Sequence, residues 1–169
     1  MFSSAFVEWI TPEWLLERVR RDLSLVLDVC AKPETARAAS FITPEEDGLV
    51  ASWTGRLDPD LADPGKPAAW WCNPPYGRAH GGRWAEKAIA EGKRSRGVLL
   101  VPARTETRWF RALARAGEVG FLPGRLYFKR PGAPPGQDEE AAPFPSALVW
   151  LGPDVWPGTR WLDWRAPKK

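Results

Sequence analysis

The chain has 169 residues, 44% of them hydrophobic, and a formal net charge of +3 at pH 7. This length fits one domain over residues 1–169, and the apolar share argues against a chain that is disordered throughout. The charge alone indicates no particular partner, while two distant cysteines and a single histidine argue against a disulfide framework and a metal site.

A helix is expected near the start of the chain. Thr11 suits its cap, Pro12 suits its first position, and an acidic residue follows. Apolar residues then recur at four-residue spacing and give the helix one apolar stripe, formed by Leu15, Val19 and Leu23.

Strands and helices alternate along the rest of the chain. Short apolar runs predict strands at residues 24–29, 49–53, 68–72, 97–101 and 147–151. A helix is predicted at about 83–91, with Trp84, Ala88 and Ile89 on one side. A second helix is predicted around Trp109, Phe110 and Leu113, which face inward. This alternation predicts an α/β sheet with helices on its faces.

Three further segments are interpreted from their turn residues and composition. A Pro-Gly turn at 123–124 lies between two apolar runs and predicts a hairpin within residues 120–128. Residues 131–142 are rich in proline, glycine and acid, so we expect a mobile loop. The strand at 147–151 is expected to be the last, and residues 153–169 are taken as a C-terminal extension.

The chain contains no segment that reads as a secretory signal. It also contains no apolar run of the roughly 20 residues that span a bilayer. We therefore expect a soluble, cytoplasmic protein without membrane contact.

Ligands of α/β sheets bind beyond the carboxyl ends of the strands. Asp28, Asn73 and Pro102 each stand at or just after the end of a predicted strand. If these strands are parallel and adjacent, the three residues lie at one edge of the sheet and mark the expected site.

Residues 73–76 read Asn-Pro-Pro-Tyr. The side-chain carbonyl of Asn73 and the backbone carbonyl of Pro74 can each accept one hydrogen of a planar amino group, which frees the nitrogen lone pair. Consecutive prolines at Pro74 and Pro75 stiffen the loop, and Tyr76 offers a flat face for stacking. The pattern fits methyl transfer to an exocyclic amine, driven by positioning and electrostatics rather than by a strong general base.

The same motif has a structural interpretation, in which the prolines form a rigid turn that Asn73 caps. A predicted strand before the motif and a glycine and helix after it favour catalysis. The chemistry fits any planar amino group, so a base in RNA or a glutamine side chain of a protein stays open as a substrate. A non-catalytic nucleic-acid-binding module that keeps the fold is the alternative from another class.

Further motifs flank this one in a fixed order over residues 9–152. They are Trp9 with Thr11 and Pro12, 28–31, 47–49 with Trp53, 101–105 with 109–110, 124–125 with Phe128, and 144–146. With these residues the chain resembles the phage-type DNA N6-adenine methyltransferases, the Dam-like enzymes of bacteriophages and prophages. The glycine-rich loop of many other methyltransferases is absent after the first strand here, as it is in the phage family.

The resemblance implies a Rossmann-like methyltransferase fold in a single domain, with a central, mostly parallel sheet and S-adenosyl-L-methionine as the methyl donor. Asp28 is then the acid that accepts hydrogen bonds from the methionine ammonium of the cofactor. Asp47 is a candidate for the ribose or adenosine end. The remaining residues implied around the cofactor are Trp9, Thr11, Pro12 and Ala31, although Thr11 equally suits a helix cap and Trp9 the core.

The resemblance also implies duplex DNA as the partner, with the target adenine turned out of the stack, and no metal. Arg104, Thr105 and Arg125 are candidate contacts to DNA, with a surface ion pair or a local hydrogen bond as the structural alternative. No separate recognition domain fits in this length, so a short or relaxed recognition sequence is expected, read near Arg125 and residues 131–142. The oligomeric state is left open.

Overall fold

The structure is a computed structural model that describes residues 9–76, 80–132, 134 and 139–165. Seven strands form its central sheet: β1 (Ser24–Asp28), β2 (Ser40–Phe41), β3 (Ala68–Cys72), β4 (Arg96–Pro102), β5 (Glu118–Phe121), β8 (Ser146–Leu151) and β9 (Gly158–Trp161). Their order is β2-β1-β3-β4-β8-β5-β9, and only β8 runs antiparallel to its neighbours. The predicted α/β fold with a mostly parallel, Rossmann-like sheet is confirmed.

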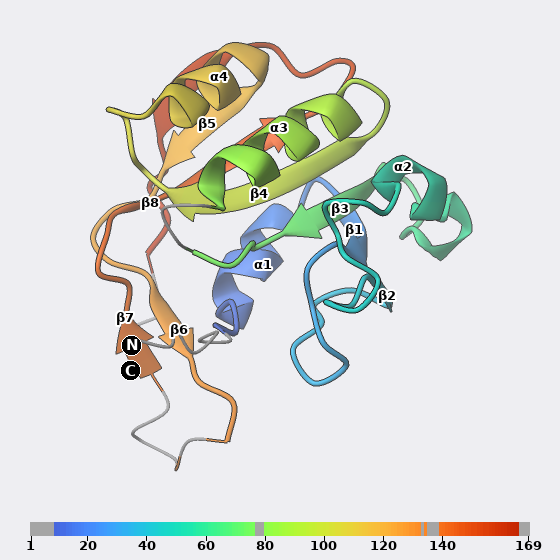
Figure 1. The fold of residues 1–169 in the computed structure, drawn as a ribbon, viewed down its shortest axis with the longest axis horizontal. Helices are drawn as coiled ribbons and strands as arrows, with labels where there is room; N and C mark the ends of the chain where they lie inside the picture. The colour runs from blue at the N-terminus through green and yellow to red at the C-terminus, as the bar shows by residue number, and fades with distance from the viewer. Residues whose placement is uncertain (1–8, 77–79, 133, 135–138, 166–169) are drawn as a thin grey trace.

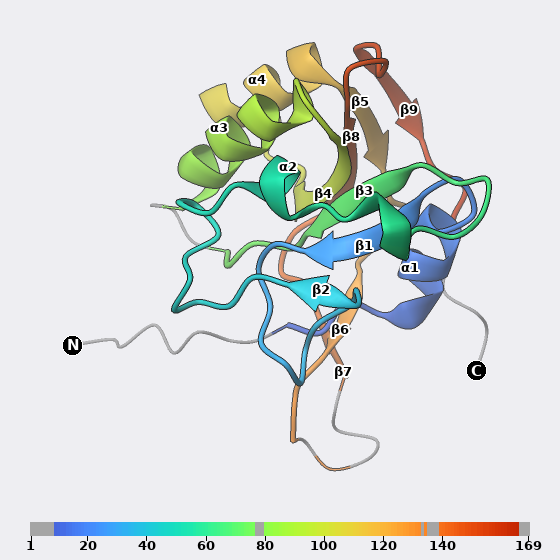
Figure 2. The ribbon, with the colours of Figure 1, turned by 90° about the vertical axis from the view of Figure 1, so that its right-hand side faces the viewer.

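Helices cover both faces of this sheet (Figures 1 and 2). They are α1 (Glu13–Val19), α2 (Trp53–Arg56), the 3-10 turn η1 (Pro59–Leu61), α3 (Gly81–Gly92) and α4 (Arg108–Ala116). Figure 1 shows α3 and α4 above the sheet and α1 below it. None of the helices in the described parts of the chain is long and apolar enough to cross a membrane.

Alternate residues of β3 feed two apolar cores, as a strand buried on both faces requires. Trp70 belongs to the core under α3 and α4, whereas Trp71 belongs to the core under α1. Both indoles are fully buried. The tryptophans that look unusual in the composition therefore supply much of the volume between the layers.

The apolar stripe predicted for α1 forms at Leu15 and Val19 but not at Leu23, which lies beyond the end of the helix, and the predicted cap does not form. Leu15 and Val19 are buried in the helix, and Leu23 is buried just before β1. The residue at the cap position is Pro12, whose side chain has no hydrogen-bonding group, and the Thr11 hydroxyl instead accepts a hydrogen bond from Asn73. The capping prediction for Thr11 is therefore wrong.

The strand predicted at 49–53 is also wrong, because this segment turns and enters α2 at Trp53. Glu91 of α3 accepts the backbone N–H groups of Trp53 at 3.2 Å and Thr54 at 3.0 Å, and Lys87 pairs with it at 2.7 Å. Burial raises the pKa of Glu91, but the hydrogen bonds from Lys87 and Thr54 outweigh it and lower that pKa to about 2. The carboxylate of Glu91, which is distant in sequence, thus stabilises the start of α2.

The hairpin predicted within 120–128 does not form. β5 pairs with β8 and β9, whereas β6 (Tyr127–Lys129) pairs with β7 (Glu139–Ala141) in a separate two-stranded sheet. Part of the loop expected at 131–142 is therefore strand β7, while residues 133 and 135–138 lie outside the described residues. β8 is not the last strand, because β9 follows it within the expected C-terminal extension.

Candidate active site

Parallel strands β1, β3 and β4 end at one edge of the sheet. Asp28 is the last residue of β1, Asn73 follows β3, and Pro102 is the last residue of β4. The sequence-based expectation that these three residues share an edge is confirmed. This edge is where a doubly wound sheet places its ligands.

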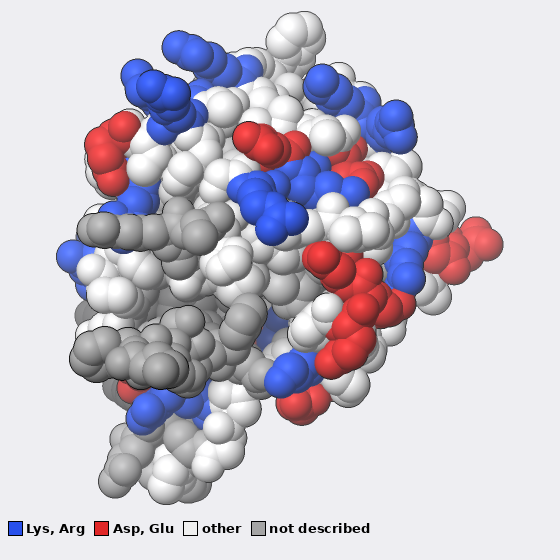
Figure 3. Space-filling view, in the orientation of Figure 1, with Lys and Arg blue, Asp and Glu red and all other residues white. Residues whose placement is uncertain are grey.

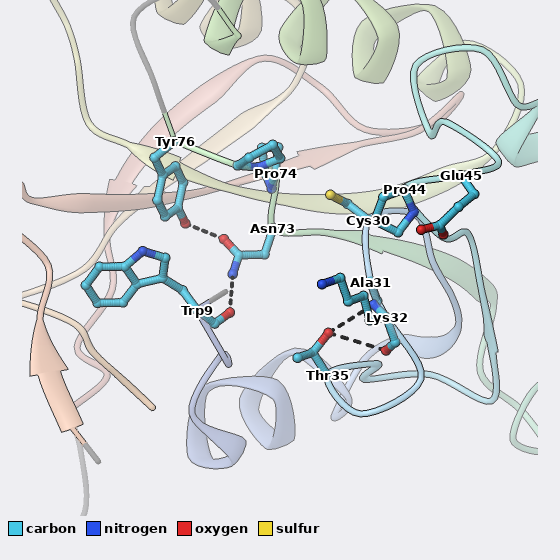
Figure 4. Close-up of a pocket in the computed structure, with 11 residues that line it drawn as sticks. Trp9, Cys30, Ala31, Lys32, Thr35, Pro44, Glu45, Asn73, Pro74 and Tyr76 are labelled. Carbon is cyan, nitrogen blue, oxygen red and sulfur yellow. Dashed lines mark hydrogen bonds between the residues drawn. The ribbon is translucent and has the colours of Figure 1, made fainter. Parts of the chain in front are cut away.

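Two cavities border residues 73–76 at this edge. The β1 cavity, of about 350 Å³, lies between the Asn73 loop and the connections on either side of β2 (Figure 4). The β4 cavity, of about 540 Å³, lies between the same loop, the start of α4 and the segment before β8. Pro74, Pro75 and Tyr76 line both cavities, so one short loop forms a wall between them.

The carboxamide of Asn73 is held in one orientation (Figure 4). Its Nδ2 donates to the backbone oxygen of Trp9 at 3.3 Å and to the Thr11 hydroxyl at 3.2 Å. Because a backbone carbonyl can only accept, the nitrogen must face Trp9 and the oxygen must face away. The carbonyl oxygen then receives the hydroxyl of Tyr76 and keeps a second lone pair.

Tyr76 is set by aromatic neighbours from distant parts of the chain. Its ring lies 5.0 Å from that of Phe144 and 6.1 Å from that of Phe128. Burial raises the pKa of the Tyr76 phenol well above its ordinary value, so the phenol keeps its proton and serves as a donor to Asn73.

Asp28 supports the wall of the β1 cavity without lining it. The side chain is 3% exposed, and its two oxygens accept the backbone N–H of Cys30 at 3.3 Å and of Arg37 at 3.0 Å. Burial raises the pKa of Asp28 to about 6 although both hydrogen bonds favour the carboxylate. Asp28 therefore folds the segment that carries Cys30 and Ala31 into the cavity wall.

Asp47 is not among the residues that line the β1 cavity either. Its backbone has a φ of 54°, and its carboxylate accepts the N–H of Leu49 at 2.9 Å, so it stabilises a turn. Cys30 and Ala31 of the motif at 28–31 do line this wall. The wall also contains residues that the sequence analysis did not single out: Lys32, Thr35, Pro44 and Glu45. These residues lie in loops without a motif, so no sequence signal identified them.

Only one of the three candidate DNA contacts lines the β4 cavity. Arg104 is exposed there, and its guanidinium lies 3.8 Å from the Glu106 carboxylate. Thr105 is exposed but outside the lining, and Arg125 lines a third cavity elsewhere. Trp109, Thr107 and Phe144 complete the β4 cavity. Across the described residues, no three His, Cys, Asp or Glu side chains are grouped so that they could hold a metal ion.

Comparison with known proteins identifies the family of this chain. A family model for DNA N-6-adenine-methyltransferase (Dam) matches residues 5–153. The chain belongs to this family. It is also similar to the DNA N-6-adenine-methyltransferase of Haemophilus phage HP1 (strain HP1c1), with 28% identity over 119 residues. The matched segment covers 68% of the chain and 61% of the phage protein, so the chain spans about three fifths of that relative.

The match confirms the family resemblance and shows which residues of the chain it covers. In this Dam-family chain the matched residues include both cavities and the loop between them. The match ends before β9, so the last strand of the sheet and residues 162–165 lie beyond it.

Proposed function

We propose that this protein transfers the methyl group of S-adenosyl-L-methionine to the N6 amine of adenine in DNA. The cofactor is proposed to bind in the β1 cavity and the target base in the β4 cavity. The observation that carries the proposal is that Pro74, Pro75 and Tyr76 line both cavities. A methyl group can pass from cofactor to base only if their binding sites are adjacent, and the two cavities are adjacent at this loop.

The residues of the β1 cavity suit the proposed cofactor. Its volume of about 350 Å³ falls in the range of small-molecule sites. Trp9 and Ala31 offer apolar surface for an adenosine group, whereas Lys32 and Glu45 bring both signs of charge to the wall, which suits a zwitterionic amino acid end. When bound, S-adenosylmethionine supplies an electrophilic methyl group on a sulfonium and leaves as a neutral thioether.

The β4 cavity suits a planar base. Tyr76, Trp109 and Phe144 place aromatic rings in its wall, and aromatic rings stack on the face of an extruded base. A base paired within duplex DNA does not expose that face. We therefore propose that the adenine leaves the duplex before it reacts, and that Arg104 at the rim contacts the DNA backbone.

The chain's own groups then prepare the amine. Asn73 lines the β1 cavity but not the β4 cavity, so we propose that the N6 amine projects from the β4 cavity past the shared wall towards Asn73. The free lone pair of the Asn73 oxygen would then accept one N6 hydrogen and the backbone carbonyl of Pro74 the other, so that the nitrogen lone pair becomes available. The nitrogen would take the methyl group, the thioether would leave with the electron pair of the carbon–sulfur bond, and the proton that the methylated amine loses would pass to solvent water. Because Trp9 and Thr11 already hold the Asn73 carboxamide, its acceptor needs little reorganisation for the reaction.

The distribution of charge favours DNA near α4. Figure 3 shows acidic side chains gathered over the segment between β2 and α2, basic side chains over α4, and both signs of charge over α3. Arg108, Arg111 and Arg115 of α4 are all exposed. α4 follows directly after residues that line the β4 cavity, so its positive charge lies on the side where the proposal places the phosphates.

The direct test is an incubation of the protein with labelled S-adenosylmethionine and unmethylated duplex DNA, followed by digestion and separation of the nucleosides. We expect label in N6-methyladenine, and its loss in the Asn73→Ala variant. The matched control is Asn73→Gln, which keeps the amide but moves its oxygen by one methylene. We expect little recovery there, because position and not only chemistry is required.

Label in RNA or protein but not in DNA would overturn the choice of substrate. Failure of the folded protein to bind S-adenosylmethionine would overturn the enzymatic function as a whole and favour a nucleic-acid-binding module that keeps the fold.

A further inference from the structure

A third cavity lies apart from the Asn73 loop. The β5 cavity, of about 270 Å³, is bordered by Trp14 of α1, by residues 122–127 after β5, and by Trp164 and Arg165 after β9. None of these residues lines the β1 or the β4 cavity. Because β5 and β9 run parallel to β4, the residues that follow them lie at the same edge of the sheet as the Asn73 loop.

The wall of the β5 cavity combines aromatic rings with guanidinium groups. Trp14, Tyr127 and Trp164 contribute the rings, and the exposed Arg125 and Arg165 contribute the positive charge. Within the described chain, no ion pair holds either of these two arginines. Rings for stacking and free guanidinium groups for phosphate are the two components of a site for single-stranded nucleic acid.

One strand connects this cavity with the candidate active site. Tyr127 and Phe128 are neighbours on β6 and point to opposite sides, since Tyr127 is 54% exposed and Phe128 is buried. Tyr127 lines the β5 cavity. The Phe128 ring lies 5.1 Å from that of Trp9 and 6.1 Å from that of Tyr76. The β5 cavity is therefore one residue away from the packing that supports the Asn73 loop.

Part of this wall lies outside the family match. The match ends at residue 153, whereas Trp164 and Arg165 follow β9. The C-terminal segment thus adds to this chain a strand and one side of a cavity that family membership does not assign.

We propose that the β5 cavity binds an unpaired nucleotide of the DNA strand, with its phosphate on Arg125 and Arg165 and its base against the aromatic rings. Its volume is below that of a site for a whole cofactor and suits one unit of a longer chain. The nucleotide must be unpaired, because in a duplex the neighbouring base pairs stack on both faces of each base and leave no face for an aromatic side chain. That it flanks the target adenine rests on the proposed function.

The test compares two labelled DNAs by fluorescence anisotropy, a blunt duplex and the same duplex with a single-stranded overhang. We expect the overhang to bind more tightly, and the Trp164→Ala and Arg125→Ala variants to lose about 10-fold on the overhang with little change on the blunt duplex. Arg125 is exposed, so its variant keeps the test valid if Trp164→Ala, which removes a ring packed on Trp150, disturbs the fold. The matched control is Arg94→Ala, an exposed arginine just before β4 at the opposite edge.

Equal binding of both DNAs by the wild type, or equal losses in Arg125→Ala and Arg94→Ala, would overturn the proposal. Because the readout is binding, it stays separate from the reaction. A protein that shows the overhang preference but forms no N6-methyladenine would support this proposal and overturn the proposed function. A protein that methylates adenine but shows no preference would overturn this proposal alone.

Discussion

The orientation of one carboxamide depends on the segment before α1. Asn73 has an oxygen and a nitrogen at nearly the same distance from its backbone, and only their partners decide which faces outward. Trp9 and Thr11, more than sixty positions earlier in the sequence, take the nitrogen. We infer that Thr11 is a positioning residue for the proposed reaction, since its hydroxyl contacts Asn73 and does not cap a helix.

Replacement of Thr11 by valine tests this inference. Thr11→Val keeps the shape of the side chain but removes one of the two acceptors of Asn73 Nδ2. We expect kcat for adenine methylation to fall roughly 10-fold, about 1.4 kcal/mol in activation free energy, with little change in the KM for S-adenosylmethionine. Thr11→Ser should restore kcat. An equal loss in both variants would contradict a role through the hydroxyl.

The buried carboxyl of Asp28 predicts a pH-dependent stability. Burial raises its pKa in the folded protein to about 6, while an unfolded aspartate titrates near 4. Between these values the folded state holds more protons, so its free energy of unfolding falls as pH rises. We expect wild type to lose about 2 kcal/mol relative to Asp28→Asn between pH 4 and pH 7.

Denaturant unfolding of both proteins at several pH values measures this difference. Other titrating groups cancel in the comparison, because both chains contain them. A difference that stays constant over the range would show that Asp28 has an ordinary pKa in the folded state.

At the scale of elements, the paired strands β3 and β4 are in contact where the indole of Trp70 lies over Gly97. A Cβ added at Gly97 of β4 would lie 1.9 Å from the Cδ2 atom of Trp70 on β3. The indole therefore occupies the space that any other residue at position 97 would need. This contact fixes Trp70 within the core under α3 and α4.

We expect Gly97→Ala to reduce the free energy of unfolding by about 3 kcal/mol or more, because Trp70 is fully buried and must shift. Gly82→Ala is the control, since no atom lies within 4 Å of a Cβ added there. In the first turn of α3 that change should be neutral or stabilising by up to about 1 kcal/mol. Thermal or denaturant unfolding compares them, and similar effects at both positions would contradict the steric argument.

Helices and strands were predicted correctly where the apolar pattern of their own residues indicates them. The strands at 68–72 and 97–101 and the helix at 83–91 form within two residues of the prediction, because each has an apolar pattern that fits only one kind of element. The segments 49–53 and 120–128 were assigned wrongly. In 49–53 the carboxylate of Glu91 accepts the backbone N–H of Trp53, and in 120–128 the strand β5 pairs with β8 and β9. Such partners are distant in sequence and leave no local pattern.

For the whole molecule, the position of two cavities on either side of one loop predicts separable binding of cofactor and DNA. Cys30 lines the β1 cavity, and Cys72 is fully buried in the core. Burial, with the charges of Asp28 and Asp47, raises the pKa of the Cys30 thiol to about 12, so alkylation should be slow and should accelerate with pH.

We expect S-adenosylmethionine to slow alkylation of Cys30, with Cys30→Ser as the control for the labelled site. The protection should be the same in Arg104→Ala, whose affinity for duplex DNA should fall several-fold, because Arg104 lines only the β4 cavity. Mass spectrometry of the labelled protein and anisotropy of labelled DNA measure the two effects. Loss of cofactor protection in Arg104→Ala would contradict two separate sites.

The sequence by itself determined the class of fold, the family resemblance and the edge of the sheet where the site lies. These depend on patterns that adjacent residues carry: apolar runs, an Asn-Pro-Pro-Tyr motif after a strand, and the order of motifs along the chain. Only the tertiary structure decided which residues line each cavity. In it the carboxylates of Asp28 and Asp47 accept hydrogen bonds from backbone N–H groups, the Thr11 hydroxyl contacts Asn73, and Arg125 lines a third cavity. The physical reason is that a side chain's partner is chosen by packing between segments far apart in sequence, which no local pattern encodes.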